Sequence, residues 1–543
     1  MTADPTHGEQ IARDDAHLRS LGIKPELRRT LGFLSNFAVA FSYISVSTGT
    51  FTNQAVAFGV GGPAIFWAWP LVILGQTFVA LNFAELASHF PVAGSIYQWS
   101  KRLSNKTLGW FTGWIYFWAG VVTVTAVAAT VPLVLSTIQG WSLSSNSPIP
   151  GLDMWQFVGL AALLTTTLIN IEGVRLFALI NNIGVVAEVL GMVVFALILL
   201  IFAHHQSPSV LFDTSFTANQ AQGYLPIFLV GMFMALFVVY GFDTAGTFGE
   251  ETVDAGRQAP RGVLSAIWLS GLVGGIFLLA VTLSFRDVGA AVTTAQAFGF
   301  PIADTIKQNL TFNLGFGTLG DLYLVLILVA VYVCTLAIQG ATVRLMFSMG
   351  RDRRMPFGGA WGHVSPTFRT PANAAVAVGI LGALPLVVLG ATASIALAIA
   401  ATGMIYISYF LCNLGVFSAR RKGWPQKGAW FSLKGWGTII NFVALLWGGL
   451  MVINIGIWTS PIFGDFGNNL RNTWSNPFIN TFLAFGKKAD GSANLLTGLP
   501  AWPVFETLVG AVVIIGAVYY LLVQRGREDR VEADLATGEA MIG

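Results

Sequence analysis

Charged residues are scarce in this sequence. Only 10% of its 543 residues are Asp, Glu, Lys or Arg, whereas 55% are hydrophobic, and the mean hydropathy is +0.69. Soluble domains carry about 25% charged residues, and a chain this apolar could not cover its own surface in water. The composition therefore excludes an ordinary soluble protein. It favours a multi-pass membrane protein whose partner is the lipid bilayer and not nucleic acid.

Motifs for catalysis, metal binding and nucleotide binding are also missing. The two cysteines, Cys334 and Cys412, lie in apolar runs and predict no disulfide framework. His204 and His205 end an apolar run without evident partners for a metal ion. No Walker-type phosphate loop occurs, so we do not expect ATP to drive the protein. We therefore expect no enzymatic activity, no cofactor and no metal site.

Long hydrophobic runs occupy most of the chain. A helix needs about 20 apolar residues to cross the hydrocarbon core of a bilayer, and windows of this length predict twelve spans. An even number of spans places both ends of the chain on the same side of the membrane. The predicted spans lie near residues 31–58, 64–89, 107–138, 152–171, 179–203, 222–253, 262–285, 318–349, 372–390, 392–418, 436–458 and 501–524.

Lys and Arg set the orientation of these spans. With the N-terminus in the cytoplasm, 24 of the 29 Lys and Arg residues fall on the inner side. The positive-inside rule therefore places both termini in the cytoplasm, and we expect a plasma (inner) membrane location. Residues 1–30, which have no signal-peptide core, and residues 525–543 are interpreted as mobile cytoplasmic tails. On the outer side we expect helices over the vestibule within 286–317 and a long loop at 459–499.

Two of the predicted spans are interrupted by polar residues. The first span contains SVSTGTF at residues 45–51, with four hydroxyl groups and a glycine, and the sixth contains YGFDTAGTF at residues 240–248. Hydroxyl side chains compete for backbone hydrogen bonds and polar groups are costly in lipid, so both stretches favour a local helix break. Interrupted spans at corresponding positions of two halves point to the binding site of a secondary transporter.

Four motifs between residues 30 and 420 resemble those of the amino acid–polyamine–organocation permeases, most closely the amino acid/choline transporter branch. The motifs are the first break with GGP at 61–63, AELA at 84–87 with FPVAGSIYQWS at 90–100, FDTA at 242–245 with EET at 250–252 and RQAPR at 257–261, and RLMFSMGRD at 344–352 with MP at 355–356. They follow one another in the order of the family and at its approximate spacing.

The resemblance implies an all-α membrane protein of twelve helices with a five-plus-five inverted repeat, in which helices one and six are broken. The first repeat would cover residues 31–203 and the second residues 222–418, with an outer loop at 204–221 between them. Two further helices would follow within residues 419–524. The resemblance also implies transport by alternating access around the two broken helices.

The broken helices offer backbone groups to a substrate that carries both charges. Free N–H groups near Gly49 and Thr50 would lie at the positive pole of a half-helix and suit a carboxylate. Carbonyl groups at the second break would accept hydrogen bonds from an ammonium group, and the resemblance implies the same arrangement. A kink that serves only helix packing is the alternative. The candidate substrate-binding residues are Ser47, Thr48, Gly49, Thr50, Tyr240, Phe242, Asp243 and Thr244.

Asp243 and Glu188 are carboxylates inside predicted spans, where an ionisable residue is a functional candidate by default. Asp243 either pairs with a cationic substrate or caps the second half of the sixth helix by accepting N–H groups near Gly246. Glu188 lies where many proton-coupled members of the superfamily carry a lysine, so this sequence departs from their pattern. Glu188 either carries a coupling proton, ligates a sodium ion or pairs with a structural partner.

Charges of both signs gather at the predicted inner end of the sixth helix. Solvated helix ends would account for the arginines there, but not for three acids in one stretch. We therefore favour ion pairs that close an inner gate and break when it opens. Lys101, Arg102 and Arg351 lie near this gate in the predicted topology. Glu85 either joins it or caps a turn, and Arg344 is expected to extend toward the inner surface. The gate candidates are Glu250, Glu251, Asp254, Arg257 and Arg261.

Matching broken helices in two halves argue against a channel, which usually repeats a pore loop or assembles around an axis. We expect a secondary active transporter that moves amino acids or related amines, either coupled to protons or by exchange. The alternative is a choline or polyamine transporter in which Asp243 pairs with the cation.

Overall fold

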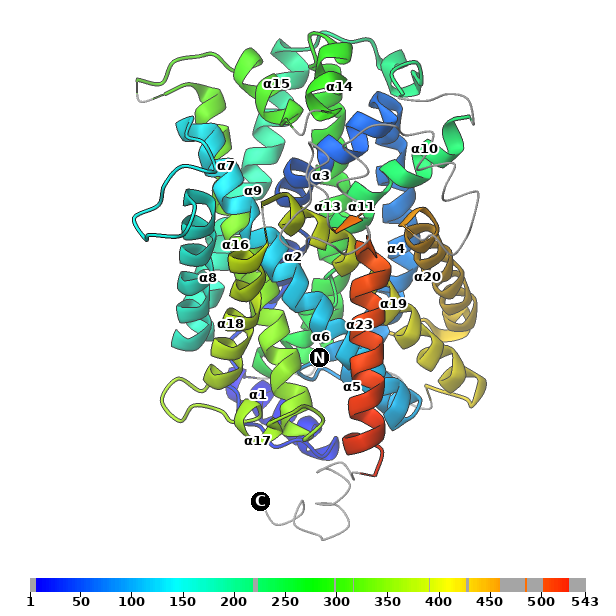
Figure 1. The fold of residues 1–543 in the computed structure, drawn as a ribbon. Helices are drawn as coiled ribbons and strands as arrows, with labels where there is room; N and C mark the ends of the chain where they lie inside the picture. The colour runs from blue at the N-terminus through cyan, green and yellow to red at the C-terminus, as the bar shows by residue number, and fades with distance from the viewer. Residues whose placement is uncertain are drawn as a thin grey trace.

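A computed structural model shows a bundle of helices whose longest members run between its two ends (Figure 1). The structure describes residues 6–217, 223–296, 299–315, 317–389, 391–425, 429–459, 484–485 and 502–526. Most of the predicted outer loop 459–499 and of the C-terminal segment 525–543 therefore lies outside the described residues.

The first part of the chain forms helices that lead up to the second break. In chain order they are α1 (His7–Ser20), α2 (Phe33–Ile44), α3 (Val46–Gly61), η1 (Pro63–Trp67), α4 (Ala68–His89), α5 (Ser95–Leu103), α6 (Lys106–Ala128), α7 (Thr130–Gln139), α8 (Met154–Glu172), α9 (Val174–Phe202), η2 (Pro208–Phe212), α10 (Tyr224–Gly231) and α11 (Phe233–Val238).

The second part is also helical, apart from one antiparallel pair of two-residue strands. Its elements are α12 (Thr244–Thr247), η3 (Gly249–Glu251), α13 (Ala255–Leu283), α14 (Val288–Gln296), α15 (Pro301–Asn309), α16 (Leu319–Arg351), α17 (Gly358–Trp361), α18 (Ala372–Val388), α19 (Ala391–Arg421), η4 (Lys434–Trp436), α20 (Gly437–Thr459), β1 (Ala484–Phe485), β2 (Trp502–Pro503), α23 (Val504–Tyr519) and the π-helical η5 (Tyr520–Gln524).

Within the described residues, nine helical segments are long and apolar enough to cross a membrane. They coincide with nine of the predicted spans. The other three predicted spans are also helical, but in shorter pieces. The first is divided into α2 and α3 with 12 and 16 residues, the sixth into α10, α11, α12 and η3, and α18 has 17 residues.

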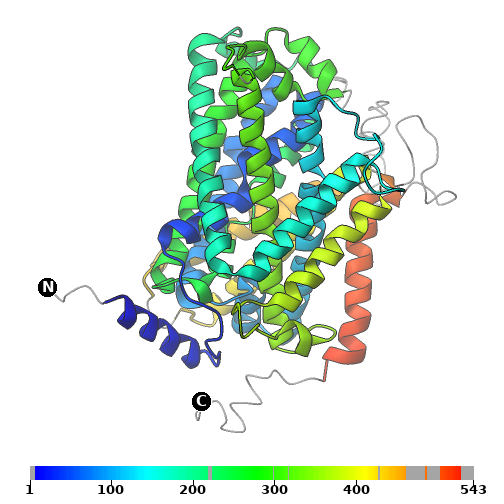
Figure 2. The same cartoon turned by 90° about the vertical axis from the view of Figure 1, so that its left-hand side faces the viewer.

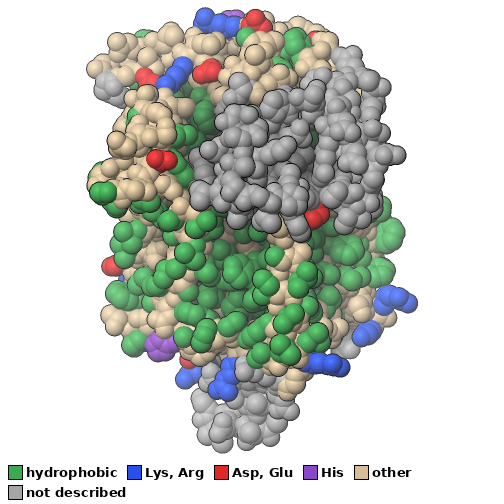
Figure 3. Space-filling model, viewed as in Figure 1, with side chains coloured by type: hydrophobic (Ala, Val, Ile, Leu, Met, Phe, Trp, Pro, Cys, Tyr) green, Lys and Arg blue, Asp and Glu red, His purple; other side chains and the backbone are tan. Residues whose placement is uncertain are grey.

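The surface of the bundle has the distribution expected for a protein in lipid. Hydrophobic side chains cover the middle of the face in Figure 3, and Lys and Arg lie at its two ends. Large apolar side chains such as Leu168, Leu190 and Ile201 are 55%, 58% and 68% exposed on α8 and α9. An apolar belt of this kind needs lipid tails around it.

The interior brings helices together that are distant in sequence. The broken helices lie among α4, α6, α9, α13, α16 and α19, and α14 and α15 pack against α3 at one end of the bundle. The expected helices within 286–317 are thus present as α14 and α15. Phe51 on α3 stacks on Phe300, just before α15, with 5.0 Å between the ring centroids. This contact joins α3, the second half of the first broken helix, to the start of α15.

The N-terminal segment differs from the mobile tail that we predicted. Residues 7–20 form α1, which begins with a capping box between Thr6 and Glu9. Figure 2 shows α1 across the lower end of the bundle. Leu18 and Ile23 are buried against Val92 in a small apolar cluster. The prediction was wrong because the low hydropathy of this segment hid the few apolar contacts that dock it.

Close helix packing gives a test of the fold. A Cβ atom at Gly75 of α4 would lie 2.2 Å from the ring of Trp447 on α20, whereas nothing lies within 4 Å of a Cβ at Gly510 on α23. We expect Gly75→Ala to destabilise the protein by about 1–3 kcal/mol, as overpacking usually does. Gly510→Ala is the matched control. The melting temperature in detergent should fall for Gly75→Ala alone, and equal values for both variants would contradict the packing of α4 on α20.

Candidate functional site

The first break lies at Ser45, which ends α2 and begins α3. Its φ of 30° is in the left-handed region that residues other than Gly seldom adopt. The Ser45 hydroxyl donates to Glu188 Oε1 at 2.9 Å, and the N–H of Thr48 donates to Ser45 Oγ at 3.4 Å. The side chain of Ser45 therefore supplies part of the hydrogen bonding that the broken helix has lost.

Glu188 reaches this break from α9. It is 3% exposed, and its Oε1 also accepts the N–H of Ser47 at 3.0 Å. A carboxylate at the first turn of α3 interacts favourably with the positive pole of that helix. Glu188 is thus placed as a partner of the break.

The N–H groups at the start of α3 are already engaged. Ser47 donates to Glu188, Thr48 to Ser45 Oγ and Gly49 to the carbonyl of Ser45 at 3.1 Å. The N–H of Gly49, which we expected to be free for a substrate carboxylate, is therefore occupied in this conformation. The Thr50 hydroxyl donates back to the carbonyl of Val46 at 2.6 Å.

The second break follows α11 and centres on Gly241. Its φ is 88°, and a Cβ there would lie 2.0 Å from Cδ1 of Tyr43 on α2. Only glycine combines this conformation with such close contact between the two broken helices. The N–H of Gly241 donates to the hydroxyl of Tyr409 at 2.8 Å. The Cβ of a side chain at Gly49 would likewise meet Val238 at 2.3 Å, so the two breaks pack directly on each other.

Asp243 is the centre of a hydroxyl cluster. Its side chain is 0% exposed and accepts hydrogen bonds from Ser95 of α5 at 2.9 Å, Tyr116 of α6 at 2.9 Å and Tyr409 of α19 at 2.6 Å. Ser95 also contacts the Thr247 hydroxyl at 2.7 Å. All of these groups are neutral, and within the described residues no basic side chain pairs with Asp243.

The capping alternative for Asp243 is wrong in this structure. The side chain accepts no N–H of α12, and the N–H of Gly246 donates instead to the backbone carbonyl of Asp243 at 2.8 Å. Burying a carboxylate without a cation costs free energy. The hydroxyl groups donate hydrogen bonds to Asp243 but supply no positive charge.

Aromatic rings, among them Tyr240 and Phe242, surround the second break. Phe242 packs against Phe83 and Tyr409, with centroid distances of 5.9 and 5.4 Å. Tyr240 meets the ring of Tyr43 edge-on at 6.2 Å. Thr244 is fully buried, and its Oγ1 has no hydrogen-bond partner among the described residues. The rings and Asp243 together make a surface that suits an organic cation.

Three of the gate candidates form ion pairs, but with partners other than Arg257 and Arg261. Glu251 accepts two hydrogen bonds from Arg344 at 2.8 and 3.0 Å, and Glu250 accepts two from Arg351 at 2.9 Å each. The side chains of Arg344 and Glu251 are both 1% exposed. Arg344 therefore does not extend to the inner surface, and α16 instead holds the end of the sixth helix through two buried pairs.

The remaining gate candidates are Asp254, Arg257 and Arg261, and none of them takes part in the two pairs with α16. Asp254 pairs with Arg13 of α1 at 2.6 Å. The Arg257 guanidinium lies 5.7 Å from the centroid of the Trp430 ring, and that of Arg261 lies 4.6 Å from the Phe33 ring. Among the residues that the structure describes, these two arginines make cation–π contacts and form none of the predicted ion pairs.

Two further buried ion pairs involve Glu85 and Asp352. Glu85 pairs with Arg420 and accepts the N–H of Leu433 at 2.9 Å, so it ties α4 to the connection between α19 and α20. It does not join the Glu250 and Glu251 cluster. Lys101 pairs with Asp352 at 2.6 Å, just after α16 ends. Burial would raise the pKa of Asp352, but the Lys101 and Arg351 cations and the hydrogen bonds from Lys101 and Tyr97 together hold that pKa below its usual value.

The hydrogen-bond partners of Asp243 and the ion-pair partner of Glu251 were not identified from the sequence. Ser95 belongs to a motif that we singled out, but nothing in it indicated contact with Asp243. Tyr116 and Tyr409 are hydroxyl-bearing rings inside apolar runs, which was a usable signal. Arg344 was a second signal, because a charge seven residues before the end of an apolar helix needs a partner.

Comparison with known proteins shows similarity to membrane permeases. The sequence model of the family described as "Amino acid permease" matches residues 31–486. The amino-acid permease BAT1 of Arabidopsis thaliana is 29% identical over 447 residues, which cover 79% of this chain and 86% of that protein. The BAT1 homolog of Oryza sativa subsp. japonica is 30% identical over 451 residues, covering 80% and 85%. The low-affinity putrescine importer PlaP of Escherichia coli (strain K12) is 26% identical over 373 residues, covering 66% and 75%.

The pair of Arg344 and Glu251 gives a second test. Removing one partner of a buried ion pair typically costs about 3–5 kcal/mol, whereas replacing both by apolar residues is often neutral. We expect Arg344→Met to lower the melting temperature strongly, and the double variant Arg344→Met with Glu251→Leu to recover most of the loss.

The exposed Arg175, at the start of α9, provides the control. Arg175→Met should leave the melting temperature unchanged. A single Arg344→Met variant as stable as this control would show that the buried pair does not hold α16 to η3.

Proposed function

Because this chain belongs to the amino acid permease family, we propose that it is a secondary active transporter that moves amino acids or related amines by alternating access. The family match confirms the resemblance to the amino acid–polyamine–organocation permeases. The chain is a multi-pass membrane permease and not an enzyme.

The proposed architecture has twelve spans, with inverted repeats at residues 31–203 and 222–418. Helical segments lie at all twelve predicted positions, and a break divides the first and sixth of them. We further propose that both termini lie in the cytoplasm, at the inner face of a plasma membrane. In support, α1 and the last described turn of the chain lie at the same end of the bundle in Figure 1.

Asp243 carries the proposal for the substrate. It is a fully buried carboxylate beside a helix break, held by three hydroxyl groups and bordered by Phe242, Tyr116 and Tyr409. A protonated amine supplies the positive charge that this environment lacks, and it can donate to the same oxygen atoms that the hydroxyls now contact. The substrate is therefore a small molecule with a protonated amine.

A second candidate substrate class is an amine without a carboxylate, such as a polyamine or choline. Glu188 and Ser45 occupy the N–H groups of Ser47 and Thr48 at the positive pole of α3. An amino acid that placed its carboxylate there would have to displace Glu188. An organic cation that binds Asp243 alone meets no such competition.

Glu188 is our candidate for ion coupling, with a proton as the coupling ion. A proton on Glu188 would remove the charge that attracts the N–H of Ser47 and the hydroxyl of Ser45. The left-handed backbone at Ser45 would then lose a partner that stabilises it. Protonation of Glu188 would in this way loosen the first break and assist the change between conformations.

The ion pairs at Glu250 and Glu251 provide the inner gate of this proposal. They join η3 to α16 while they are formed. On the other side of the breaks, the stack of Phe51 on Phe300 supports the proposal of an outer gate.

Substitution of Asp243 tests the proposed amine site. A hydrogen bond to a charged group contributes about 1.5–3 kcal/mol, and each 1.4 kcal/mol is a factor of ten in affinity. We expect Asp243→Asn to weaken uptake by about tenfold to a hundredfold in proteoliposomes. The panel is a neutral amino acid, γ-aminobutyrate, putrescine and choline.

Asp213→Asn, on an exposed loop after η2, is the matched control and should transport normally. Wild-type uptake restricted to putrescine or choline would favour the second candidate class. Uptake that is unchanged in Asp243→Asn would remove Asp243 from the binding site.

Substitution of Glu188 tests the coupling role. Glu188→Gln keeps the shape of the side chain but cannot gain or lose a proton. We expect the pH dependence of uptake by this variant to be flat over the range in which the wild-type rate changes, while substrate binding persists. An unaltered pH profile in proteoliposomes would exclude Glu188 as the carrier of the coupling proton.

A further inference from the structure

The connection between α1 and α2 is attached to the inner end of the sixth helix. Arg29 is 8% exposed, and its Nη1 donates to the carbonyls of Gly249 and Thr252 at 3.0 and 2.5 Å. These carbonyls bracket η3, the short helix that carries Glu250 and Glu251. A guanidinium group at carbonyls that end a helix is electrostatically favourable, so Arg29 holds the segment that also forms the gate.

Backbone hydrogen bonds reinforce this attachment. The N–H groups of Thr30 and Leu31 both donate to the carbonyl of Glu251 at 2.9 Å, and the N–H of Val253 donates to the carbonyl of Leu31 at 2.8 Å. The side chain of Asn36, in the first turns of α2, donates to the hydroxyl of Thr252 at 2.9 Å. The start of the first broken helix and the end of the sixth therefore form one hydrogen-bonded unit.

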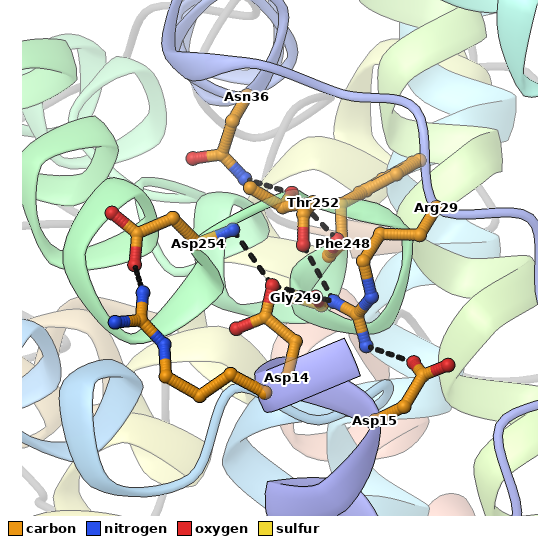
Figure 4. A network of polar contacts seen from close by, with 9 residues as sticks. Asp14, Asp15, Arg29, Asn36, Phe248, Gly249, Thr252 and Asp254 are labelled. Atoms are coloured by element: carbon orange, nitrogen blue, oxygen red, sulfur yellow. Dashed lines mark hydrogen bonds and ion pairs between the residues drawn. The ribbon is translucent and has the colours of Figure 1, made fainter. Parts of the chain in front are cut away.

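Helix α1 encloses Arg29 from the other side. Figure 4 shows Asp14 and Asp15 of α1 pointing toward the guanidinium of Arg29 and the backbone of Asp254. Asp15 Oδ1 lies 3.4 Å from Arg29 Nη2, and Asp14 Oδ2 accepts the N–H of Asp254 at 2.7 Å. Arg13 pairs with the Asp254 carboxylate. The residue Asp254 has a left-handed φ of 53°, and the contacts from α1 stabilise it on both its backbone and its side chain.

We propose that residues 7–31 are a latch that holds the inner end of the transporter closed, with Arg29 as its positioning residue. The proposal rests on the alternating-access function given above. An inner opening that separates the start of α2 from η3 must withdraw Arg29 from both carbonyls and release α1 from Asp254. The latch therefore sets the balance between the closed and the inward-open conformations, although no part of it touches the substrate site.

A native thiol reports on this balance without any substrate. Cys412 is fully buried on α19, which packs against α5, close to the segment that contacts Glu250. It is protected in this structure, and we expect opening of the inner side to expose it. The full-length chain with Cys334→Ala keeps Cys412 as its single thiol, so that the rate of labelling by a membrane-impermeant maleimide measures inner access in inside-out vesicles.

We expect Arg29→Gln to increase this labelling rate by about fivefold or more, which is the lower end of typical coupling between sites. Labelling from the outer side, in right-side-out vesicles, should stay at the background rate. Arg29→Lys keeps the charge but has no planar fork to reach both carbonyls, and should give an intermediate rate. The neighbouring Arg28 is exposed, and Arg28→Gln is the matched control that should label as slowly as the parent.

The outcomes separate a latch from a general weakening of the fold. Faster labelling from both sides, or a rate equal to that of Arg28→Gln, overturns the proposal. If Arg29→Gln does not accumulate, the double variant Asp14→Asn with Asp15→Asn removes the two negative charges of α1 beside Arg29 and leaves Arg29 in place. It should also increase labelling from the inner side, and a parental rate overturns the latch. Because labelling needs no substrate, a failure of the proposed transport activity would appear separately, in the uptake assay.

Discussion

Inside a bilayer, a broken helix must find every hydrogen-bond partner within the protein, because no water is present to replace the lost bonds. Ser45 meets this demand at the first break with its own hydroxyl and with Glu188 from α9. At the second break the hydroxyl of Tyr409 from α19 accepts the N–H of Gly241. The helices around the breaks are thus positioned by the polar groups that the breaks expose. The need for hydrogen-bond partners within the protein also places Glu188 and Asp243 next to the proposed substrate site.

The same constraint explains the inner end of the molecule. Glu250 and Glu251 are too deeply buried to be solvated, so each is matched by an arginine of α16. Arg29 is matched by two carbonyls and by the acids of α1. Since each buried charge has its partner on a different helix, a relative movement of the helices must break these pairs together. Helices joined in this way adopt a small number of distinct arrangements with few intermediates between them, as a gate requires.

Much of the fold could be predicted from the sequence because lipid imposes local rules. Apolar runs of sufficient length located the helices, and Ser45 to Thr50 and Gly241 located the breaks. The candidate site was predicted less well. Asp243 was placed at the break, but the capping alternative was wrong. Arg351, which we expected near the gate, does pair with Glu250, whereas the pairing of Glu251 with Arg344 was not predicted. The hydropathy pattern also did not predict that α1 packs on the bundle. The helix is polar, but it is held by the burial of Leu18 and by the contact of Asp15 with Arg29.

The sequence by itself determined that the chain crosses a membrane, where its helices lie, and that the first and sixth of them are broken. These properties depend on residues that are neighbours in the chain, and lipid acts on each stretch separately. Only the tertiary structure decided which groups meet. Asp243 and Tyr409 are 166 positions apart, and Arg29 and Gly249 are 220 positions apart. The physical reason is that a hydrogen bond or ion pair depends on the distance between atoms in space, and that distance is set by the packing of whole helices.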